Sequence, residues 1–159
     1  MIAIEKLLVP TDFSEYSKFA LKYAVALARS FKAKIYVVYV HDPYPQGAAF
    51  EGMYYDPALV EQTQNKAREI LNGIVEDLRA QKIDATPVFL NGRASLEIIS
   101  HAEQLAVDLI VIATHGRKGI SHLVFGSTAE KVVRMAPCPV LTVKHPEHEF
   151  IDEKPEVRT

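Results

Sequence analysis

The sequence predicts an α/β fold in which an open five-stranded parallel sheet carries helices on both faces. Strand-like apolar runs alternate with helix-like segments along the chain, which is typical of parallel strands joined by helical crossovers. The runs are also nearly continuous in apolar residues, as at 108–113 (DLIVIA), which indicates strands that are covered on both faces. With 159 residues, of which 48% are hydrophobic, the chain is long enough for one domain with a substantial core.

The order of elements is strand, helix, strand and so on, beginning and ending with a strand. The strands are expected at Lys6–Val9, Ala33–Val40, Ile83–Leu90, Asp108–Ala113 and Pro139–Val143. The helices are expected from Tyr16 to Phe31 and at Ala58–Gln81, Ser95–Leu105 and Ser127–Met135. Helical spacing predicts a buried stripe of Tyr16, Ala20, Tyr23, Leu27 and Phe31 on the first helix, and of Ile70, Ile74 and Leu78 on the second.

Two segments lack a regular period. Residues 42–57 hold three prolines and two glycines, and a loop of this length is commonly a lid or a binding loop. The charged end of the chain is expected to fray as a tail. We therefore expect one domain at 1–146 and a C-terminal tail at 147–159.

Composition excludes several classes of function. A net charge of −2 gives no electrostatic reason to expect nucleic acid or an anionic membrane as a partner. The single cysteine, Cys138, excludes an internal disulfide and a cysteine-based metal cluster. The N-terminus shows no signal-peptide pattern, and no apolar run reaches the length of a membrane span. We expect a cytoplasmic protein.

The segment 113–128 (ATHGRKGISHLVFGST) carries the strongest chemical signal. Gly116, Gly119 and Gly126 permit close backbone approach, and Gly126-Ser127-Thr128 opens a helix whose free N–H groups favour an anion. These features predict a phosphate cradle. A structural alternative is a capping box in which Ser127 and Glu130 satisfy each other's backbone N–H groups.

The same segment resembles the nucleotide-binding motif of the universal stress protein family, G-x2-G-x9-G-[ST], here Ala113-x2-Gly116-x9-Gly126-Ser127. Three further stretches resemble the family in order: 9–14 (VPTDFS), 38–40 (VYV) and 136–141 (APCPVL). The resemblance spans about residues 4–144. One departure stands out, because Ala113 replaces the first glycine of the motif. Membership of the family's non-nucleotide-binding branch is the alternative that this change leaves open. That branch departs more widely from the motif, whereas Gly116, Gly126 and Ser127 are intact here, so the resemblance favours the ATP-binding branch.

The resemblance implies a role for each matching residue. Asp12 and Val40 would meet adenine, Ile112 and Ala113 would offer backbone to base and ribose, and Gly116 would contact phosphate through its N–H. The full set of implied nucleotide-binding residues is Pro10, Thr11, Asp12, Val40, Ile112, Ala113, Gly116, Arg117, Gly119, Gly126, Ser127 and Thr128. A helix N-cap is the structural alternative for Asp12, and ordinary core packing is the alternative for Val40.

The family resemblance also implies ATP with Mg²⁺ or Mn²⁺ as cofactor, a role as sensor or regulator in stress response, and a homodimer through the last strand, Pro139–Val143. A slow ATPase and a nucleotide-free dimeric adaptor are the alternatives. The sequence has no Walker lysine and no obvious general base, which favours binding over turnover. A dinucleotide enzyme is disfavoured because Pro10-Thr11-Asp12 stands where G-x-G-x-x-G would follow the first strand.

Other candidates carry less chemistry. His115 and His122 are not spaced as a metal pair, and Cys138 is expected to behave as a small buried hydrophobe. Tyr54 and Tyr55 are placed where they can close over a nucleotide or act as packing anchors.

Overall fold

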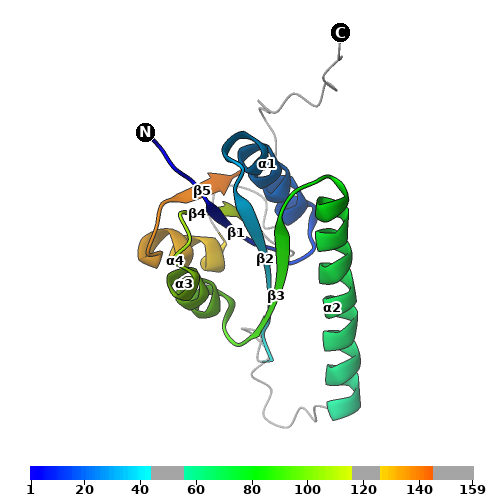
Figure 1. Cartoon of the computed structure of the whole chain (residues 1–159). Coiled ribbons are helices and arrows are strands. Elements are labelled where there is room, and N and C mark those ends of the chain that lie inside the picture. Colours follow the sequence, from blue (N-terminus) through cyan, green and yellow to red (C-terminus); the bar gives the residue numbers. More distant parts are fainter. Residues whose placement is uncertain (44–55, 116–125, 145–159) are drawn as a thin grey trace.

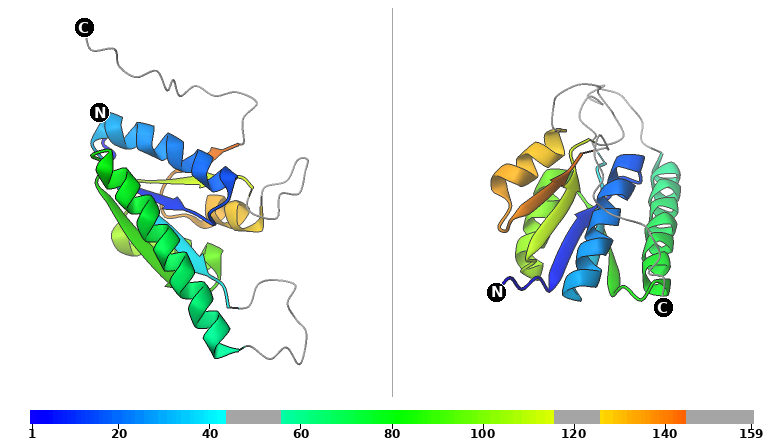
Figure 2. Two further views of the ribbon diagram at one scale, coloured as in Figure 1. Left: turned by 90° about the vertical axis from the view of Figure 1, so that its right-hand side faces the viewer. Right: turned by 90° about the horizontal axis from the view of Figure 1, so that it is seen from above.

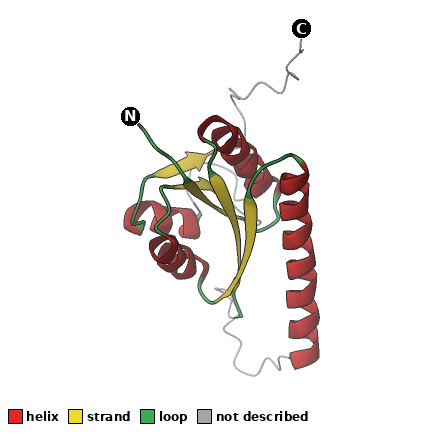
Figure 3. Ribbon diagram, in the orientation of Figure 1, coloured by secondary structure: helices red, strands yellow, loops and turns green. Residues whose placement is uncertain are grey.

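The computed structural model describes residues 1–43, 56–115 and 126–144. Strands and helices alternate along it as predicted (Figures 1 and 3). The elements are β1 (Lys6–Pro10), α1 (Glu15–Phe31), β2 (Lys34–His41), α2 (Pro57–Ala80), β3 (Ala85–Asn91), α3 (Ala94–Leu105), β4 (Leu109–Ala113), α4 (Ser127–Met135) and β5 (Val140–Val143). All five strands pair in parallel in the order β3-β2-β1-β4-β5, which confirms the predicted fold class.

This strand order contains one switch point. The chain moves outward from β1 through β2 to β3, then crosses back to β4 and moves outward again to β5. The crossovers on the two sides of β1 therefore leave the sheet on opposite faces. In the view from above, α1 and α2 lie on one side of the sheet and α3 and α4 on the other (Figure 2).

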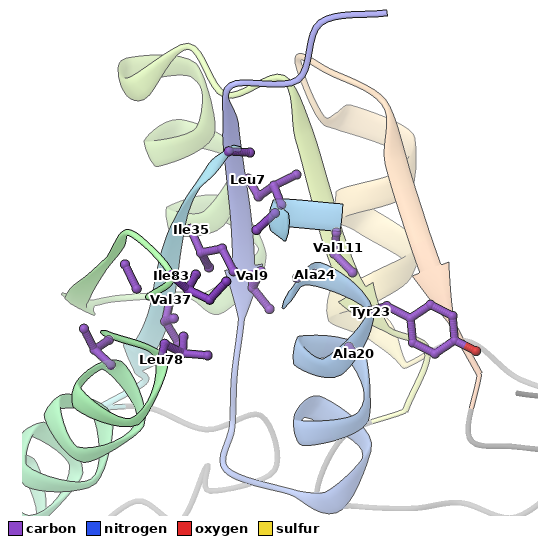
Figure 4. Close-up of a cluster of buried hydrophobic side chains, with 14 of the residues drawn as sticks. Leu7, Val9, Ala20, Tyr23, Ala24, Ile35, Val37, Leu78, Ile83 and Val111 are labelled. Atoms are coloured by element: carbon purple, nitrogen blue, oxygen red, sulfur yellow. The ribbon is translucent and has the colours of Figure 1, made fainter. Parts of the chain in front are cut away.

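Each face of the sheet has its own hydrophobic core. On the α1 and α2 face, Leu7, Val9, Ile35 and Val37 pack against both helices (Figure 4). On the other face the core is built around Leu8, Val38, Ile98, Ile110 and Val132. Burial of each such side chain contributes roughly 1.5–3 kcal/mol. The two cores hold the central strands rigidly, and with them the residues at the strand ends.

The buried stripes of α1 and α2 differ from the predicted ones. On α1 the buried residues are Ser17, Ala20, Tyr23, Ala24 and Ala28, whereas Phe31 is 39% exposed. On α2 the buried residues are Ala67, Leu71, Val75 and Leu78, whereas Ile70 is 40% exposed. On α1 the small side chains of Ala20, Ala24 and Ala28 face the sheet, which lets the helix pack closely on it. The predicted stripes are right in part, because Ala20, Tyr23 and Leu78 are buried and Tyr16, Leu27 and Ile74 pack against the core. The prediction is wrong for Phe31 and Ile70.

The β3 edge of the sheet is blocked against further pairing. The Gly92 N–H donates to the His41 carbonyl across β2 and β3, at 2.9 Å. Successive residues of a strand point their backbone groups to opposite sides. Pro87 therefore occupies an outward-facing position and has no N–H to offer there. The outward-facing Ala85 carbonyl already accepts a hydrogen bond from Arg79 Nε at 3.1 Å.

The β5 edge has neither an outward-facing proline nor, among the described residues, a side chain bonded to its outward backbone groups. The Val143 carbonyl accepts from the Thr114 N–H at 3.1 Å, so this residue faces β4. By the same alternation, the N–H and carbonyl groups of Val140 and Thr142 face away from the sheet. Among the described residues, no strand pairs with that side of β5.

Candidate functional site

The two central strands separate at their carboxyl ends. The register between β1 and β4 joins Leu7 with Leu109 and Leu8 with Ile110. Beyond these pairs β1 turns into α1, while β4 continues to Ala113. In open parallel sheets a ligand binds at such a switch point, outside the carboxyl ends of the strands. The described site residues from both strands therefore lie around this switch point, and the space between the ends of β1, β2 and β4 is called the crevice below.

Val40 presents its backbone to this crevice. The Thr11 N–H donates to the Val38 carbonyl at 2.8 Å, which ends the ladder between β1 and β2. Val40 has the same orientation as Val38, because residues two apart in a strand face the same side. Its N–H and carbonyl thus point into the space that β1 has left. Its side chain packs on the α3 and α4 core, as the packing alternative predicted.

On the opposite side of the crevice, Ala113 and Ile112 face different ways. The backbone of Ile112 faces β5, with which it pairs at Thr142, and its side chain is 5% exposed. Ala113 alternates with it, so its backbone faces β1 and the crevice. This orientation supports a ligand contact for the Ala113 backbone and disfavours the contact expected for the Ile112 backbone.

The substitution of alanine for the first motif glycine is accommodated without strain. Ala113 is absent from the positive-φ residues of the described chain, so its backbone suits any residue. Its methyl group packs in the core on the α1 face. A glycine is therefore not needed at this position for the fold.

The turn from β1 into α1 is fixed by side-chain hydroxyls. Ser14 is the N-cap of α1, and its hydroxyl accepts from the Ser17 N–H at 3.3 Å. The Asp12 carboxylate accepts from the Ser14 N–H at 3.0 Å and also from the Ser14 hydroxyl. Ser14 is therefore the N-cap of α1. Asp12 is not the N-cap; its carboxylate is held at the mouth of the crevice.

Phe13 adopts a backbone conformation that is uncommon for a bulky residue, with φ of 65°. Its N–H donates to Thr11 Oγ1 at 3.1 Å. Its ring stacks on Tyr39 with centroids 4.6 Å apart and an interplanar angle of 7°. These contacts hold a left-handed residue in place, as is common where a turn shapes a functional site.

The beginning of α4 is joined to the end of β4. The Gly126 N–H donates to the Thr114 carbonyl at 2.8 Å, and the Glu130 N–H donates to the Gly126 carbonyl at 3.0 Å. Gly126 is therefore the N-cap, and Ser127 and Thr128 form the first turn. Their N–H groups have no acceptor within the helix, and the positive end of the helix dipole lies there.

The predicted capping box is wrong. It required Ser127 to be the N-cap, but Ser127 is the first helical residue and Gly126 makes no side-chain cap. Glu130 instead forms an ion pair with Arg134 at 3.2 Å. The structural explanation for Ser127 is thereby removed, and its exposed hydroxyl stands beside the crevice without a capping role.

Buried polar residues mark the same place. Four polar residues of the described chain are buried, and three of them, Thr11, Ser17 and Thr114, lie next to the ends of β1 and β4. Thr114 Oγ1 is 2.9 Å from His115 Nδ1, and the His115 ring contacts Tyr16 of α1. Sequence reasoning missed Ser17 and Thr114 as site residues. A hydroxyl directly after an apolar strand was the available signal for Thr114.

Comparison with known proteins places this arrangement in a family. The family model described as the universal stress protein family matches residues 3–144. The chain belongs to the universal stress protein family. A curated universal stress protein of Methanocaldococcus jannaschii is 34% identical over 146 residues, covering 91% of this chain and 85% of the relative.

Solved structures of universal stress proteins share the fold. UspA from Lactobacillus plantarum superposes with a TM-score of 0.75 at 24% identity, covering 90% of this chain and 99% of that one. A universal stress protein from Archaeoglobus fulgidus, solved in complex with dAMP, has a TM-score of 0.59 at 23% identity, covering 89% of this chain and 98% of that one. At these identities the likeness concerns the fold.

Part of the universal stress protein motif lies outside the described residues. Gly116, Arg117 and Gly119 belong to that part. Tyr54, Tyr55 and His122 also lie outside the described residues. The predictions for these residues remain predictions. The described ranges hold the two ends of the motif, Ala113 and Gly126-Ser127-Thr128, and bring them together.

The described residues offer no protein-only metal site, because no group of three or more His, Cys, Asp or Glu side chains converges there.

Burial raises the pKa of the Cys138 thiol, with a smaller contribution from the charge of Asp108. Cys138 is therefore a neutral thiol at pH 7, in line with its expected packing role. No helix in the described ranges of this universal stress protein meets the length and hydrophobicity needed to cross a membrane.

Proposed function

We propose that this universal stress protein binds ATP, with Mg²⁺ or Mn²⁺, at the carboxyl ends of β1 and β4, and acts as a sensor or regulator in the cytoplasm. The observation that carries the proposal is the geometry of Gly126 at the start of α4. The complex of the A. fulgidus protein with dAMP is a property of that protein. The argument here depends on residues of this chain.

Gly126 has no conformational reason to be glycine. Its φ is −55° and its ψ is 148°, values that any residue adopts. Among the described residues, an added Cβ would meet the Thr114 carbonyl oxygen at 3.5 Å, which is ordinary contact. A bare backbone at the N-terminus of a helix, beside two hydroxyl residues, is what a closely bound phosphate requires. The phosphates are therefore proposed to lie on Gly126, Ser127 and Thr128.

The base and ribose are proposed to occupy the crevice between β1 and β4. The backbone groups of Val40 supply a donor and an acceptor, and Asp12 supplies a carboxylate that can accept from the 6-amino group of adenine. The Ala113 backbone faces the same space from β4. Together these groups suit a ligand with a planar polar edge.

Mg²⁺ or Mn²⁺ is proposed to enter with the nucleotide. Mg²⁺ keeps several waters and is commonly held by substrate phosphates with one or two carboxylates. Asp12 is proposed to contact adenine, so the phosphates and water would supply the ligands of the ion. The ion supplies charge neutralisation for the phosphates, and no protein cage is needed.

Binding rather than rapid turnover is proposed, because the sequence holds no Walker lysine and no evident base. Slow hydrolysis and a nucleotide-free adaptor remain the alternatives.

A homodimer through β5 is also proposed. In support of it, the β3 edge is blocked by Pro87 and Arg79, while β5 presents the backbone groups of Val140 and Thr142 outward. An open edge is a template for pairing, so a second copy is proposed to pair along β5.

Calorimetric titration with ATP and Mg²⁺ tests the proposal. Wild type should bind, and Gly126→Val should lose binding while keeping its fold, since the branched side chain would fill the space proposed for phosphate. Gly73→Ala is the matched control, because Gly73 lies on α2 and no heavy atom of the described residues comes within 4 Å of its added Cβ. Equal ATP binding by wild type and Gly126→Val would exclude the proposed cradle.

A further inference from the structure

The Ser14 hydroxyl bonds both the start of α1 and the Asp12 carboxylate. This hydroxyl accepts from the Ser17 N–H as the cap of α1, and it donates to Asp12 Oδ1. A hydroxyl has one proton and two lone pairs, so both bonds can form together. We propose that Ser14 is a positioning residue that sets the preference of the site for adenine by fixing the Asp12 carboxylate; this inference rests on the proposed nucleotide site.

The Ser14 hydroxyl has two acceptors within reach, Asp12 Oδ1 and Ser17 Oγ, and the contact with Ser17 Oγ is long, at 3.4 Å, whereas the contact with Asp12 is short. A carboxylate is also the stronger acceptor, so the Ser14 proton goes to Asp12. Ser17 Oγ donates to the Ser14 carbonyl at 2.9 Å, so it must accept from Thr11 Oγ1, 3.1 Å away. Thr11 Oγ1 in turn accepts from the Phe13 N–H. The protons of Thr11 and Ser17, which are both buried, thus have acceptors other than Asp12. The Ser14 hydroxyl proton is directed to Asp12, alongside the Ser14 N–H.

A carboxylate fixed in this way discriminates between purines. An ionised carboxylate only accepts hydrogen bonds, so it suits the 6-amino group of adenine and opposes the 6-oxo group of guanine or hypoxanthine. When the carboxylate and a 6-oxo group face each other in a crevice, both are acceptors, and each loses its hydrogen bond to water without gaining another. A site of this kind therefore rejects the wrong analogue strongly. A carboxylate free to rotate would turn away from the oxo group and tolerate it.

The experiment compares the affinities for ATP and inosine triphosphate, which differ at position 6 and in protonation at N1. Wild type should favour ATP by about tenfold or more. Ser14→Ala retains the Ser14 N–H donor but loses the hydroxyl donor, and the ratio should fall by about fivefold. Ser14→Thr keeps both the helix cap and the hydroxyl donor, so this variant should show the wild-type ratio of ATP affinity to inosine triphosphate affinity.

Ser17→Ala is the control for loss of stability alone. It breaks the buried hydroxyl chain in the same turn but removes no donor to Asp12, so its ATP preference should stay at the wild-type value even if its melting temperature falls. An unchanged ratio in Ser14→Ala would overturn the role of Ser14, as would an equal fall in Ser17→Ala. Failure of wild type to bind either triphosphate would overturn the nucleotide proposal itself, and this inference with it.

Discussion

At the residue scale, the start of α4 shows which residue caps the helix and which residues are left for the proposed phosphate contact. Gly126 is the N-cap through its backbone, and the Glu130 N–H bonds to its carbonyl. Ser127 follows as the first helical residue and caps nothing. The sequence alone could not distinguish these registers, because Ser127 and Glu130 have capping-box spacing. Because α4 begins one residue earlier than the capping box requires, Ser127 is a residue of the first turn and not the N-cap.

Ser127→Ala should therefore weaken ATP binding while leaving the free energy of unfolding nearly unchanged. Loss of a serine cap would cost about 1 kcal/mol, and the structure shows no such cap at Ser127. Urea denaturation and ATP titration of the same variant measure the two effects separately. A loss of about 1 kcal/mol in stability would show that Ser127 caps α4 after all.

At the element scale, the apolar runs located the strands well because buried parallel strands are apolar on both faces. Helix faces were harder to predict. Both Ile70 and Leu71 are apolar, and the choice between them depends on how α2 rests on β3, which periodicity does not specify. The edge properties of the sheet were also invisible until strand order placed Pro87 on one edge and Thr142 on the other.

Gly73→Ala should raise the free energy of unfolding by about 1 kcal/mol, because alanine is a far better helix former than glycine. Gly73 lies in α2, its φ is not positive, and its added Cβ meets no atom within 4 Å. Urea or thermal denaturation measures the change. A destabilised variant would mean that this face of α2 is covered.

Thr142→Pro should shift the proposed homodimer towards monomer. The Thr142 N–H faces outward from β5, so proline removes a donor for the partner strand and none of the bonds to β4. Thr142→Val keeps that N–H and serves as the control. Val143→Lys is unsuitable, since Val143 is 6% exposed and packs in the core. Light scattering at matched concentration decides, and a Thr142→Pro protein that remains dimeric would exclude the β5 interface.

At the scale of the whole molecule, the account depends on one property of the topology. Reversal of the strand order at β1 and β4 leaves a crevice into which Val40 and Ala113 turn their backbones, while α4 begins beside it. Alternating elements in the sequence predicted this sheet, and the motif indicated which end of it carries the site. The facing of each backbone could be derived only from the hydrogen-bond register.

Backbone amide NMR during a titration with ATP and Mg²⁺ tests the central claim most directly, because it reports both binding and location. The account predicts saturable shifts at Asp12, Val40 and Gly126–Thr128, with little change along α2 or the β3 edge. Amide signals that stay unchanged at millimolar ATP, or that shift only at sites remote from β1 and β4, would contradict it.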